Sequence, residues 1–580
     1  MKIIKVSVKN FRNLHKLEVI LNPEINFVVG ENDAGKSNFL DMLEAIMNNR
    51  RFSEEDFFNT ENPIEVEFVL SLDNIEKGAF EDFFSPDSND QIQIIAKQED
   101  PEEYIKYRHK DTEEEISYTK LRRVNFIKYD SLRTPKEELT FYKNRGVGKF
   151  LGYLIERLLH PNEEDIGDKY IQKDNINFLV KDINEKLEKI RMFKEYRINA
   201  TLEENIRDLL FKIITIKDSK GFNIQNTGHG VQFSILIVLS ILEKLMVLIE
   251  DKKYEDCIFG EETNRSISLI LGMDEPEIHL HPYMQRSLVK YVSKLLGNKE
   301  KDFSILIKEL FNVDNVIGQA IIVSHSPNIL LDNYKYIVRF YSEGTEIKAV
   351  SGENLAIEGG VEKHLLMNFP YIKEAMFSRC VVIVEGHSEA GALPPWITKE
   401  IGDIDEHGIT VIQAGGGQSI YPIVKLLNEL KITNVSIVDR DIYEKSKANY
   451  DLIENLFVTD KEDFESTLVE SLLSADKKDV LFRLVEEFSD KGLSYSIYNQ
   501  KLKNIATKYK IDITWDNSRD YKFDEIESIN SDNLTKTMFL SWLDIRKSIV
   551  LGRFIGDVVE KQNIPKSYVD AINKAKEKTK

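Results

Sequence analysis

A phosphate-binding loop stands between a strand and a helix near the start of the chain, and few folds can present it. Ile25 to Val29 is a short apolar run typical of a buried strand, Gly30 to Ser37 follows it directly, and Asn38 to Met47 has apolar helical periodicity. In this context the glycines let backbone N–H groups curl round phosphates, Lys36 reaches the terminal phosphates, and the Ser37 hydroxyl can ligate Mg²⁺. The sequence therefore predicts an α/β fold with a nucleotide site at the end of this strand.

A second nucleotide motif follows the apolar run Ile267 to Gly272, which is short enough for a buried parallel strand. Asp274 and Glu275 stand at the tip of that strand. Two adjacent carboxylates there suit a Mg²⁺-nucleotide site in which Asp274 holds the metal and Glu275 orients an attacking water. A solvated acidic turn is the alternative interpretation of this pair.

The segments around these motifs predict an antiparallel layer and a helical insertion. From Val147 to Leu210 the pattern becomes helical and charged, and we interpret this as an inserted arm. A dimerisation arm and a plain helical cap within the domain both fit the apolar stripe. The expected strands of the antiparallel layer are Ile3 to Lys9, Leu17 to Leu21, Ile64 to Leu72 and Ile92 to Ala96.

Two weaker signals lie on either side of the acidic pair. The segment Asn226 to Gln232 carries Gly228 and Gly230 just before an apolar helix, where backbone N–H groups can face a phosphate. Ala320 to Val323 is another short apolar strand, and His325 follows it. A histidine at a strand tip suits contact with a γ-phosphate, and a structural role is the alternative.

In this order, the P-loop, the glycine signature, the Asp-Glu pair and the strand-tip histidine resemble the ABC-type ATPase heads of the SMC and RecF group, over residues 1 to about 355. The resemblance implies that the glycine signature closes on ATP held by a second subunit, and hence a dimer, and that the histidine senses the γ-phosphate. The signature departs from the transporter form Leu-Ser-Gly-Gly-Gln, which disfavours transport. The implied ATP-binding residues are Gly30, Asn32, Gly35, Lys36, Ser37, Asn38, Gly228, Gly230, Gln232, Asp274 and His325, with Ser37 and Asp274 as metal ligands.

The C-terminal third predicts a second chemistry at the tips of a small parallel sheet. One apolar strand ends at Glu385, with Glu389 in the first turn of the next helix, and a second strand ends at Asp439 and Asp441. The triple glycine Gly415 to Gly417 makes a tight turn between them. Two like charges about 4 Å apart cost about 4 kcal/mol at an effective dielectric of about 20, so a gathered set calls for divalent cations.

The ordered set E-G-x-x-E, G-G-G and D-x-D resembles the Toprim fold of topoisomerases, primases and OLD-family nucleases. An ABC ATPase followed by Toprim is the architecture of the OLD (overcoming lysogenization defect) family, which includes the nuclease subunit of the Gabija anti-phage system. The resemblance then covers essentially the whole chain. It implies an ATPase N-terminal lobe (1–146), an inserted helical dimerisation arm (147–210), an ATPase C-terminal lobe (211–370) and a Toprim nuclease domain with a helical insertion (371–580).

The same resemblance assigns the nuclease residues. Lys547 resembles the lysine that supports the scissile phosphate, with Arg546 and Arg553 as alternatives. Only 21 residues separate Asp441 from Asp463, while 81 lie between Glu465 and Lys547, so a helical insertion must fall in the second gap. The implied metal-binding carboxylates are Glu385, Glu389, Asp439, Asp441, Asp463 and Glu465.

Charge and cysteine content narrow the setting. A net charge of −20 disfavours indiscriminate nucleic-acid binding, although a Debye length of about 8 Å leaves local basic patches effective. Cys257 and Cys380 have no CxxC partner, which predicts neither a disulfide framework nor a zinc site and favours the cytoplasm. We expect no membrane-spanning segment, because the longest apolar run, Phe233 to Leu242, is followed by charged residues.

The motifs together predict an ATP-binding DNA endonuclease that uses Mg²⁺ or Mn²⁺ by the two-metal route to nick or cut duplex DNA. The expected setting is bacterial anti-phage defence, with nucleotide regulating cleavage. The expected partners are double-stranded DNA, further copies of the chain in a dimer or dimer of dimers, and a UvrD-like helicase. The alternative is a RecF-like, ATP-gated DNA-binding repair protein whose Toprim domain binds metal without cleaving.

Overall fold

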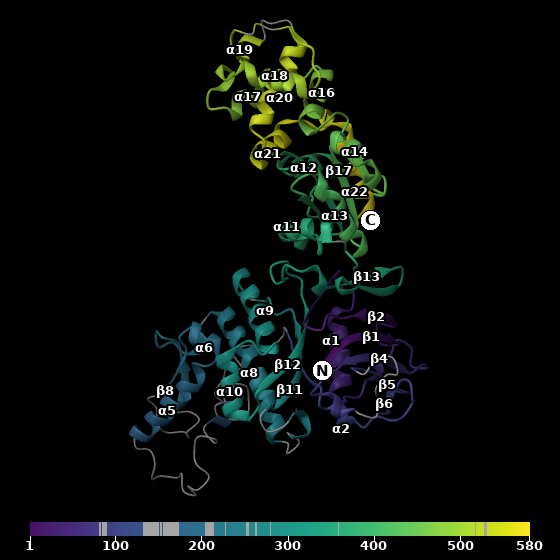
Figure 1. Cartoon of the computed structure of the whole chain (residues 1–580), viewed down its shortest axis with the longest axis vertical. Coiled ribbons are helices and arrows are strands. Elements are labelled where there is room, and N and C mark those ends of the chain that lie inside the picture. The colour runs from purple at the N-terminus through teal and green to yellow at the C-terminus, as the bar shows by residue number, and fades with distance from the viewer. Residues whose placement is uncertain are drawn as a thin grey trace. The chain divides into compact units, whose positions relative to one another are not determined.

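The computed structural model describes residues 1–80, 83, 90–130, 150, 153–154, 173–202, 214–226, 228–250, 255–260, 264–278, 280–357, 359–514, 516, 518–526 and 531–579. The chain divides into two compact units, Met1–Asn354 and Leu355–Lys580. Figure 1 draws the first unit from purple to teal and the second from green to yellow. Each unit is built on its own parallel sheet.

The sheet of the first unit has the order β10-β11-β12-β3-β13-β14, and β7 also pairs with β11. β3, β7, β11, β12 and β13 run parallel, while β10 and β14 are antiparallel edge strands. Every residue of β3 and β11 is buried, as expected for parallel strands covered on both faces. The strands are β3 (Ile25–Gly30), β7 (Asn125–Tyr129), β10 (Ile258–Phe259), β11 (Ser266–Asp274), β12 (Asn315–Val323), β13 (Ile337–Glu343) and β14 (Glu346–Ser351).

An antiparallel sheet covers one face of this parallel sheet, with helix α1 (Lys36–Met47) between them. Its order is β2-β1-β4-β5-β6, which agrees with the expected antiparallel layer. Phe39 and Leu43 of α1 belong to one hydrophobic core with Val6 and Ile270 of the two sheets. The P-loop helix is therefore fixed by apolar packing on both sides. The strands are β1 (Lys2–Lys9), β2 (Lys16–Ile20), β4 (Ile64–Ser71), β5 (Gln91–Gln98) and β6 (Lys106–His109), and the short helix α2 (Tyr118–Leu121) precedes β7.

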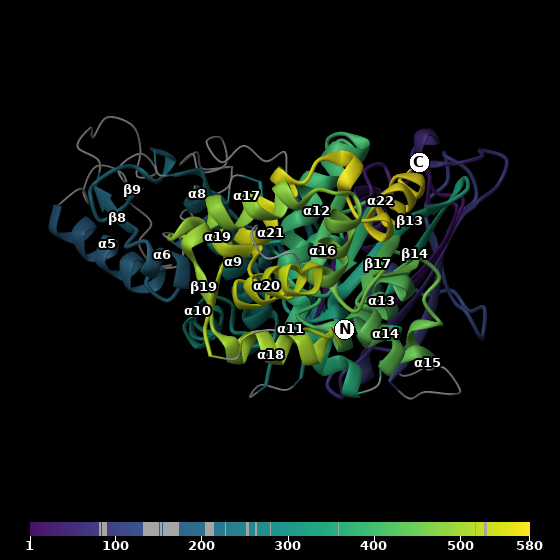
Figure 2. The ribbon, with the colours of Figure 1, turned by 90° about the horizontal axis from the view of Figure 1, so that it is seen from above.

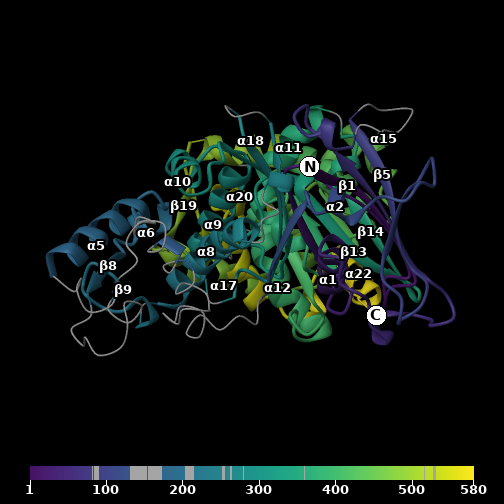
Figure 3. The same cartoon turned by 90° about the horizontal axis from the view of Figure 1, so that it is seen from below.

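Helices α8 (His229–Glu250), α9 (Pro282–Leu296) and α10 (Lys301–Phe311) lie on the opposite face of the parallel sheet from α1 (Figure 1). Of the expected arm at 147–210, part lies outside the described residues. The described part contains α5 (Lys173–Leu187), α6 (Arg191–Glu195) and β8 (Asn199–Leu202), which pairs with β9 (Ile214–Lys217). Figure 3 shows α5, β8 and β9 at one end of the unit, beyond α6 and α8.

The second unit has a four-stranded parallel sheet in the order β16-β15-β17-β18. Its strands are β15 (Cys380–Val384), β16 (Ile409–Gln413), β17 (Asn434–Val438) and β18 (Leu456–Val458). Helices α11 (Gly359–Ala375) and α13 (Ile420–Glu429) pack together on one side, and α12 (His387–Ile401) and α22 (Lys566–Lys578) pack together on the other. The units divide before α11 rather than after residue 370, because α11 contacts α13 and β16.

Most of the chain between Glu465 and Lys547 is helical. This is the longer of the two gaps in the sequence, where a helical insertion was expected. Figure 2 shows α17, α18, α19 and α20 grouped beside the α/β part of the second unit, away from α13, α14 and β17. Within this span β19 (Ser496–Ile497) pairs with β20 (Tyr521–Lys522). The further helices of the second unit are α14 (Arg440–Lys445), α15 (Lys447–Tyr450), α16 (Phe464–Ser474), α17 (Lys478–Phe488), α18 (Asn499–Lys508), α19 (Phe523–Ile526), α20 (Asp532–Ile545) and α21 (Ile549–Val558).

Two glycines let α21 approach α12 closely. A Cβ added at Gly391 of α12 would lie 2.2 Å from the carbonyl oxygen of Ile549, and one added at Gly552 of α21 would lie 2.1 Å from the carbonyl oxygen of Ser388. Neither position has room for a side chain, so the two backbones are in direct contact. This contact fixes the start of α21, and with it Lys547, against the helix that carries Glu389.

Among the residues described, none of the helices combines the length and the apolar character needed to cross a bilayer.

Candidate functional site

Three neighbouring strand ends form the first candidate site, in the first unit. β3, β12 and β11 lie side by side and run parallel, so their carboxyl ends meet at one edge of the sheet. The P-loop leaves β3, Asp274 and Glu275 stand at the end of β11, and His325 follows β12. Motifs far apart in the sequence are therefore brought together at this edge.

The P-loop backbone has positive φ at Gly30 and Gly35, a conformation that favours glycine. Gly30 has φ +144°, and a Cβ there would lie 2.1 Å from the carbonyl oxygen of Phe340 on β13. Lys36 Nζ donates to the carbonyl oxygens of Gly30 at 3.0 Å and Glu31 at 2.6 Å. Burial lowers the pKa of Lys36, although the negative charges of Glu275 and Asp274 act to raise it. The ammonium thus lies over the loop that would hold a phosphate, which is the arrangement a P-loop lysine needs.

Ser37 and Asp274 meet beside the P-loop and fit a magnesium ion. Ser37 Oγ donates to Asp274 Oδ1 at 3.0 Å. Burial raises the pKa of Asp274, so a nearby cation would stabilise its carboxylate. Hydroxyl and carboxylate oxygens are the donors that Mg²⁺ takes in nucleotide sites.

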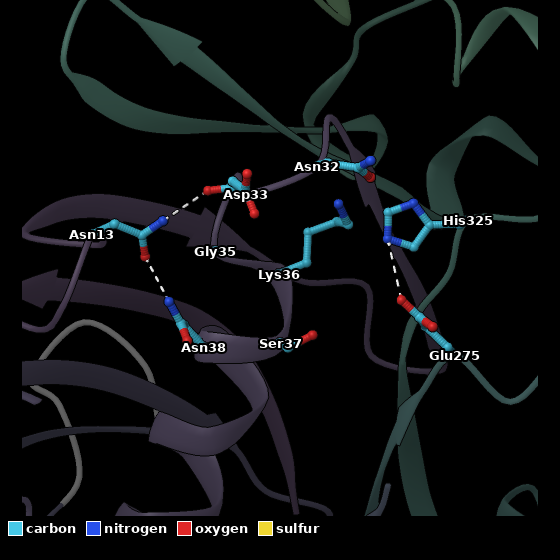
Figure 4. Close-up of a pocket in the computed structure, with 9 residues that line it drawn as sticks. All are labelled: Asn13, Asn32, Asp33, Gly35, Lys36, Ser37, Asn38, Glu275 and His325. Carbon is cyan, nitrogen blue, oxygen red and sulfur yellow. Dashed lines mark hydrogen bonds and ion pairs between the residues drawn. The ribbon is translucent and has the colours of Figure 1, made fainter. Parts of the chain in front are cut away.

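A pocket of about 570 Å³ opens at this edge, within the size range of small-molecule sites. Figure 4 shows Lys36 between Asn13 on one side and His325 with Glu275 on the other. The pocket is lined by Asn13, Asn32, Asp33, Gly35, Lys36, Ser37, Asn38, Glu275 and His325.

Glu275 and His325 lie next to each other in the lining of the pocket. His325 Nε2 lies 3.4 Å from Glu275 Oε1. Burial, followed by the charge of Lys36, lowers the pKa of His325, which favours a neutral imidazole. Glu275 has φ +45°, an uncommon conformation for a residue with a side chain, and such strain clusters at functional sites. A carboxylate and an imidazole at this separation can orient a water molecule beside a phosphate, and this role of the pair stays a prediction.

Two polar residues of this site have no motif of their own in the sequence. Asn13 lines the pocket, donates to the Asp33 carbonyl oxygen at 3.0 Å and accepts from Asn38 Nδ2 at 2.8 Å. Glu277 Oε1 accepts from Ser324 Oγ and from the backbone N–H of His325, both at 2.7 Å. Glu277 therefore ties the loop after β11 to the loop after β12. Its position two residues beyond Glu275 is the one signal that the sequence offered.

The glycine signature lies at the start of α8, away from this lining. Gly228 is exposed just before the helix, and Gln232 is buried within it. The expected role of Gly228, Gly230 and Gln232 across a subunit interface stays a prediction.

The second candidate site lies at the carboxyl edge of the sheet in the second unit. Glu385 follows β15, Asp439 and Asp441 follow β17, and Asp463 lies beyond β18. The strands run parallel and adjacent, so these ends share one edge. The carboxylates expected from three separate motifs are brought into one region.

Glu385 and Asp439 are partly buried carboxyl groups in this region, and each has one buried oxygen. Glu385 Oε2 and Asp439 Oδ1 are buried, and neither has a hydrogen-bond partner within the described part of the chain. Burial, followed by the charge of Asp441, raises the pKa of Glu385. Burial, followed by the charges of Glu389 and Glu385, raises the pKa of Asp439. Buried oxygens without partners are costly, so the site calls for a cation.

Glu389 is held from two sides in the first turn of α12. Its Oε2 accepts from the backbone N–H of Gly386 at 3.0 Å, and its Oε1 accepts from the hydroxyl of Tyr568 at 2.8 Å. Tyr568 lies on the C-terminal helix α22 and is completely buried. Burial raises the pKa of Glu389. Both carboxylate oxygens are therefore fixed in place.

Asp463 caps α16 and binds a lysine. Its Oδ1 accepts from the backbone N–H of Ser466 at 3.0 Å, and its Oδ2 accepts from Lys508 Nζ at 2.8 Å and the Tyr509 hydroxyl at 2.6 Å. Although burial acts in the opposite direction, the hydrogen bonds from Lys508 and Tyr509 lower the pKa of Asp463. Asp463 is therefore ionised, and both of its carboxylate oxygens accept hydrogen bonds.

A second lysine binds the other acidic residue of this turn. Lys547 Nζ donates to Glu465 Oε2 at 2.7 Å. Arg546 instead packs over the rings of Tyr495 and Trp542, at 4.2 and 5.1 Å from the ring centroids. Of the three basic residues considered for the scissile phosphate, Lys547 contacts the carboxylate cluster. The third, Arg553, pairs with Asp557 at 3.5 Å.

The donor set fits a hard divalent cation in charge and type. All its members are carboxylates, and oxygen ligands suit Mg²⁺, Mn²⁺ and Ca²⁺. In the part of the chain that the structure describes, no three His, Cys, Asp or Glu side chains converge on one point. Asp441, for example, turns outward to Lys445 Nζ at 2.7 Å. Rotation of such exposed side chains would be needed to complete a metal shell.

Three residues of this site were missed by sequence reasoning: Lys508, Tyr509 and Tyr568. Lys508 and Tyr509 lie in the helical insertion, and Tyr568 lies on the last helix. None of them belongs to a spaced motif, and their partners are distant in sequence. The carboxylates could be predicted because each follows a strand, whereas these partners depend on how helices pack.

Comparisons with known proteins match a family to part of each of the two units. Residues 1–145 and 142–330 match the family described as AAA ATPase domain. Residues 376–441 match the family described as overcoming lysogenization defect protein-like, TOPRIM domain. The expected ABC-type ATPase head followed by a Toprim domain, and the resemblance to the OLD family, are thereby confirmed.

Individual relatives are distant. The chain is 23% identical to the Old nuclease of Escherichia phage P2 over 516 residues, which cover 80% of each protein. It is 24% identical to Endonuclease GajA of Bacillus cereus strain HuB5-5 over 335 residues, covering 50% of this chain and 45% of that protein. Among solved structures, an SMC head bound to the C-winged helix domain of ScpA is similar with a TM-score of 0.35 and 16% identity, covering 62% of this chain and 100% of that one.

Proposed function

This chain belongs to the AAA ATPase domain family and, with its OLD-like Toprim domain, to the OLD family of ATPase–Toprim nucleases, and on that premise we propose that it is a metal-dependent DNA endonuclease governed by ATP. The observation that carries this proposal is the set of carboxylates at the Toprim sheet edge, with Lys547 bound to one of them, Glu465. The similarity to the Old nuclease and to Endonuclease GajA supports it.

The carboxylates would hold the cations. Glu385 and Asp439 offer buried oxygens without hydrogen-bond partners, and Glu389 is already oriented by Tyr568. Asp441 and Glu465 can complete the shell once their lysine partners move. When bound, Mg²⁺ or Mn²⁺ supplies an activated water and stabilises the leaving oxygen in a two-metal site.

The basic residue of the site would bind the scissile phosphate. The Lys547 side chain is 44% exposed. Burial acts to lower its pKa, but the nearby charge of Glu465 raises it above the usual value, so Lys547 is protonated at neutral pH. Its partner Glu465 lies on the first turn of α16, beside the cluster. A lysine in this place can neutralise one phosphate oxygen while the carboxylates hold the cations on the other side.

The ATPase head would regulate this cleavage. Lys36 and Ser37 bind the phosphates and their Mg²⁺ with Asp274, and Glu275 activates the water. We expect the glycine signature of one copy to complete the ATP site of another, which makes the active form a dimer or a dimer of dimers. The Toprim site is then controlled by nucleotide-dependent association.

The proposed setting is bacterial anti-phage defence, in the cytoplasm, with double-stranded DNA as the substrate. The similarity to Endonuclease GajA supports the endonuclease activity on which this setting depends. A UvrD-like helicase is the proposed further partner.

A plasmid assay tests the proposal. Purified protein is incubated with supercoiled plasmid and Mg²⁺ or Mn²⁺, with and without ATP, and with EDTA. We expect nicked or linear product that EDTA abolishes, and no product from Glu385→Ala, while the exposed-surface control Glu406→Ala cuts normally. Metal-independent cutting would contradict the site. ATP-dependent DNA binding with no cutting by any preparation would favour the RecF-like, non-cleaving alternative.

A further inference from the structure

Two lysines, not one, bind the acidic turn at the start of α16. Lys547 Nζ contacts Glu465 Oε2 at 2.7 Å, and Lys508 Nζ contacts Asp463 Oδ2 at 2.8 Å. The two carboxylates are two residues apart, and the two lysine side chains are equally exposed, at 44% and 45%. Lys508 therefore stands in the same relation to the cluster as Lys547 does.

The surroundings of both ammonium groups are shared. Lys508 Nζ lies 4.0 Å from Asp544 Oδ1, and the charges of Asp463 and Asp544 also act on Lys547. Lys508 comes from the C-terminal end of α18 in the helical insertion, while Lys547 precedes α21. Two separate elements thus deliver positive charge to one acidic turn.

Lys508 has unused hydrogen-bonding capacity. Its ammonium has three donors. Two donate, to Asp463 Oδ2 and to the Tyr509 hydroxyl, both at 2.8 Å. The third has no hydrogen-bond partner in the described part of the chain, and 45% of the side chain is exposed to solvent. A phosphate oxygen can therefore be bound without breaking the contact to Asp463.

Both carboxylate oxygens of Asp463 have hydrogen-bond donors other than Lys508. The carboxylate already accepts from Tyr509 at 2.6 Å and from the backbone N–H of Ser466 at 3.0 Å. A role in satisfying the buried Asp463 alone therefore does not account for a lysine side chain that is 45% exposed.

We propose that Lys508 is a second phosphate-binding residue of the nuclease site, contacting the DNA backbone next to the phosphate that Lys547 binds. Asp463 and the ring of Tyr509, whose centroid lies 4.5 Å from Lys508 Nζ, hold the ammonium in place. The helical insertion then takes part in substrate binding through α18. This inference rests on the proposed endonuclease function.

The salt dependence of DNA binding tests it without cleavage. Duplex DNA binding is measured from low to moderate salt, without metal and with Ca²⁺. Each lost phosphate contact reduces the slope of log K against log salt by about 0.9 for duplex DNA. We expect this reduction for Lys508→Gln and for Lys508→Met, which keeps the stem over Tyr509, and a wild-type slope for Lys508→Arg.

Two variants separate substrate binding from a structural role. Tyr509→Phe removes the hydroxyl that donates to Asp463 Oδ2 and accepts from Lys508 Nζ, but it changes no charge and keeps the ring, so it should keep the wild-type slope. Lys503→Gln removes an exposed lysine from the same helix, five residues away and on another face, and should also keep it. A wild-type slope in both Lys508→Gln and Lys508→Met, or an equal loss in Tyr509→Phe, would overturn the inference. If wild-type protein neither bound nor cut DNA, the proposed function would fail with it.

Discussion

The hydroxyl of Tyr568, on the C-terminal helix, donates a hydrogen bond of 2.8 Å to Oε1 of Glu389, 179 residues earlier in the chain. Both groups are buried. The last helix of the chain therefore orients a carboxylate at the opposite end of the Toprim sequence. Because Tyr568 cannot reach solvent, the bond constrains Glu389 in every state in which α22 is docked.

Removing that hydroxyl should weaken metal binding. In Tyr568→Phe, Glu389 loses one of the two hydrogen bonds that orient it, and residues that orient metal ligands typically contribute about 10- to 100-fold in metal affinity. Titration of Mn²⁺ by calorimetry should show a decrease of that order. Tyr498→Phe, at a 72% exposed position, is the matched control and should bind as wild type. Equal Mn²⁺ affinity in all three proteins would remove Tyr568 from the site.

The contact between α12 and α21 should be sensitive to a single methyl group. In Gly552→Ala the new Cβ meets the Ser388 carbonyl oxygen at 2.1 Å, so α21 must move and Lys547 with it. Overpacking of this kind typically costs about 1–3 kcal/mol. We expect a lowered melting temperature and a strong loss of cleavage. Val550→Ala, at an exposed position on the same helix, should change neither, and normal cleavage by Gly552→Ala would show that the close approach is not needed.

Loss of the P-loop lysine should abolish tight nucleotide binding. Lys36→Ala removes the charged side chain that lies over the loop, bonded to the carbonyl oxygens of Gly30 and Glu31. Fluorescent ATP binding should fall by orders of magnitude, whereas Lys5→Ala, at a partly exposed lysine on β1, should bind ATP normally. Unchanged ATP affinity in Lys36→Ala would refute the assignment of this pocket.

Metal binding should strengthen as pH rises. Burial raises the pKa of both Asp439 and Glu389, so without metal these groups hold protons well above the usual carboxyl range. Their contribution to stability is fully present below the ordinary carboxyl pKa and is lost as pH rises through the raised values. A cation must displace these protons, so Mn²⁺ affinity and the thermal shift on adding Mn²⁺ should both increase from pH 6 to pH 8. A pH-independent Mn²⁺ affinity would contradict this.

The sequence predicts the sheet edges well because their signals are local. Asp274 is the last residue of one apolar strand, and Glu385 and Asp439 each follow another directly. Parallel strands bring such tips together. Lys508 and Tyr568 could not be predicted in the same way. Their partners lie 45 and 179 residues away, and the contacts depend on how α18 and α22 pack. The outward turn of Asp441 toward Lys445 is likewise set by side-chain rotation rather than by motif spacing.

The central claim is that ATP turnover and DNA cleavage take place at separate sites in separate units, and one paired assay tests it most directly. Plasmid cleavage and ATP turnover are measured on the same preparations of Asp439→Asn and Glu275→Gln. We predict that Asp439→Asn loses cleavage by orders of magnitude while its ATP turnover stays at the wild-type level, because one metal ligand is removed from a separate unit. Glu275→Gln should lose ATP turnover and still cut DNA under at least one nucleotide condition. Cleavage abolished in Glu275→Gln under all nucleotide conditions, together with normal cleavage by Asp439→Asn, would contradict the account.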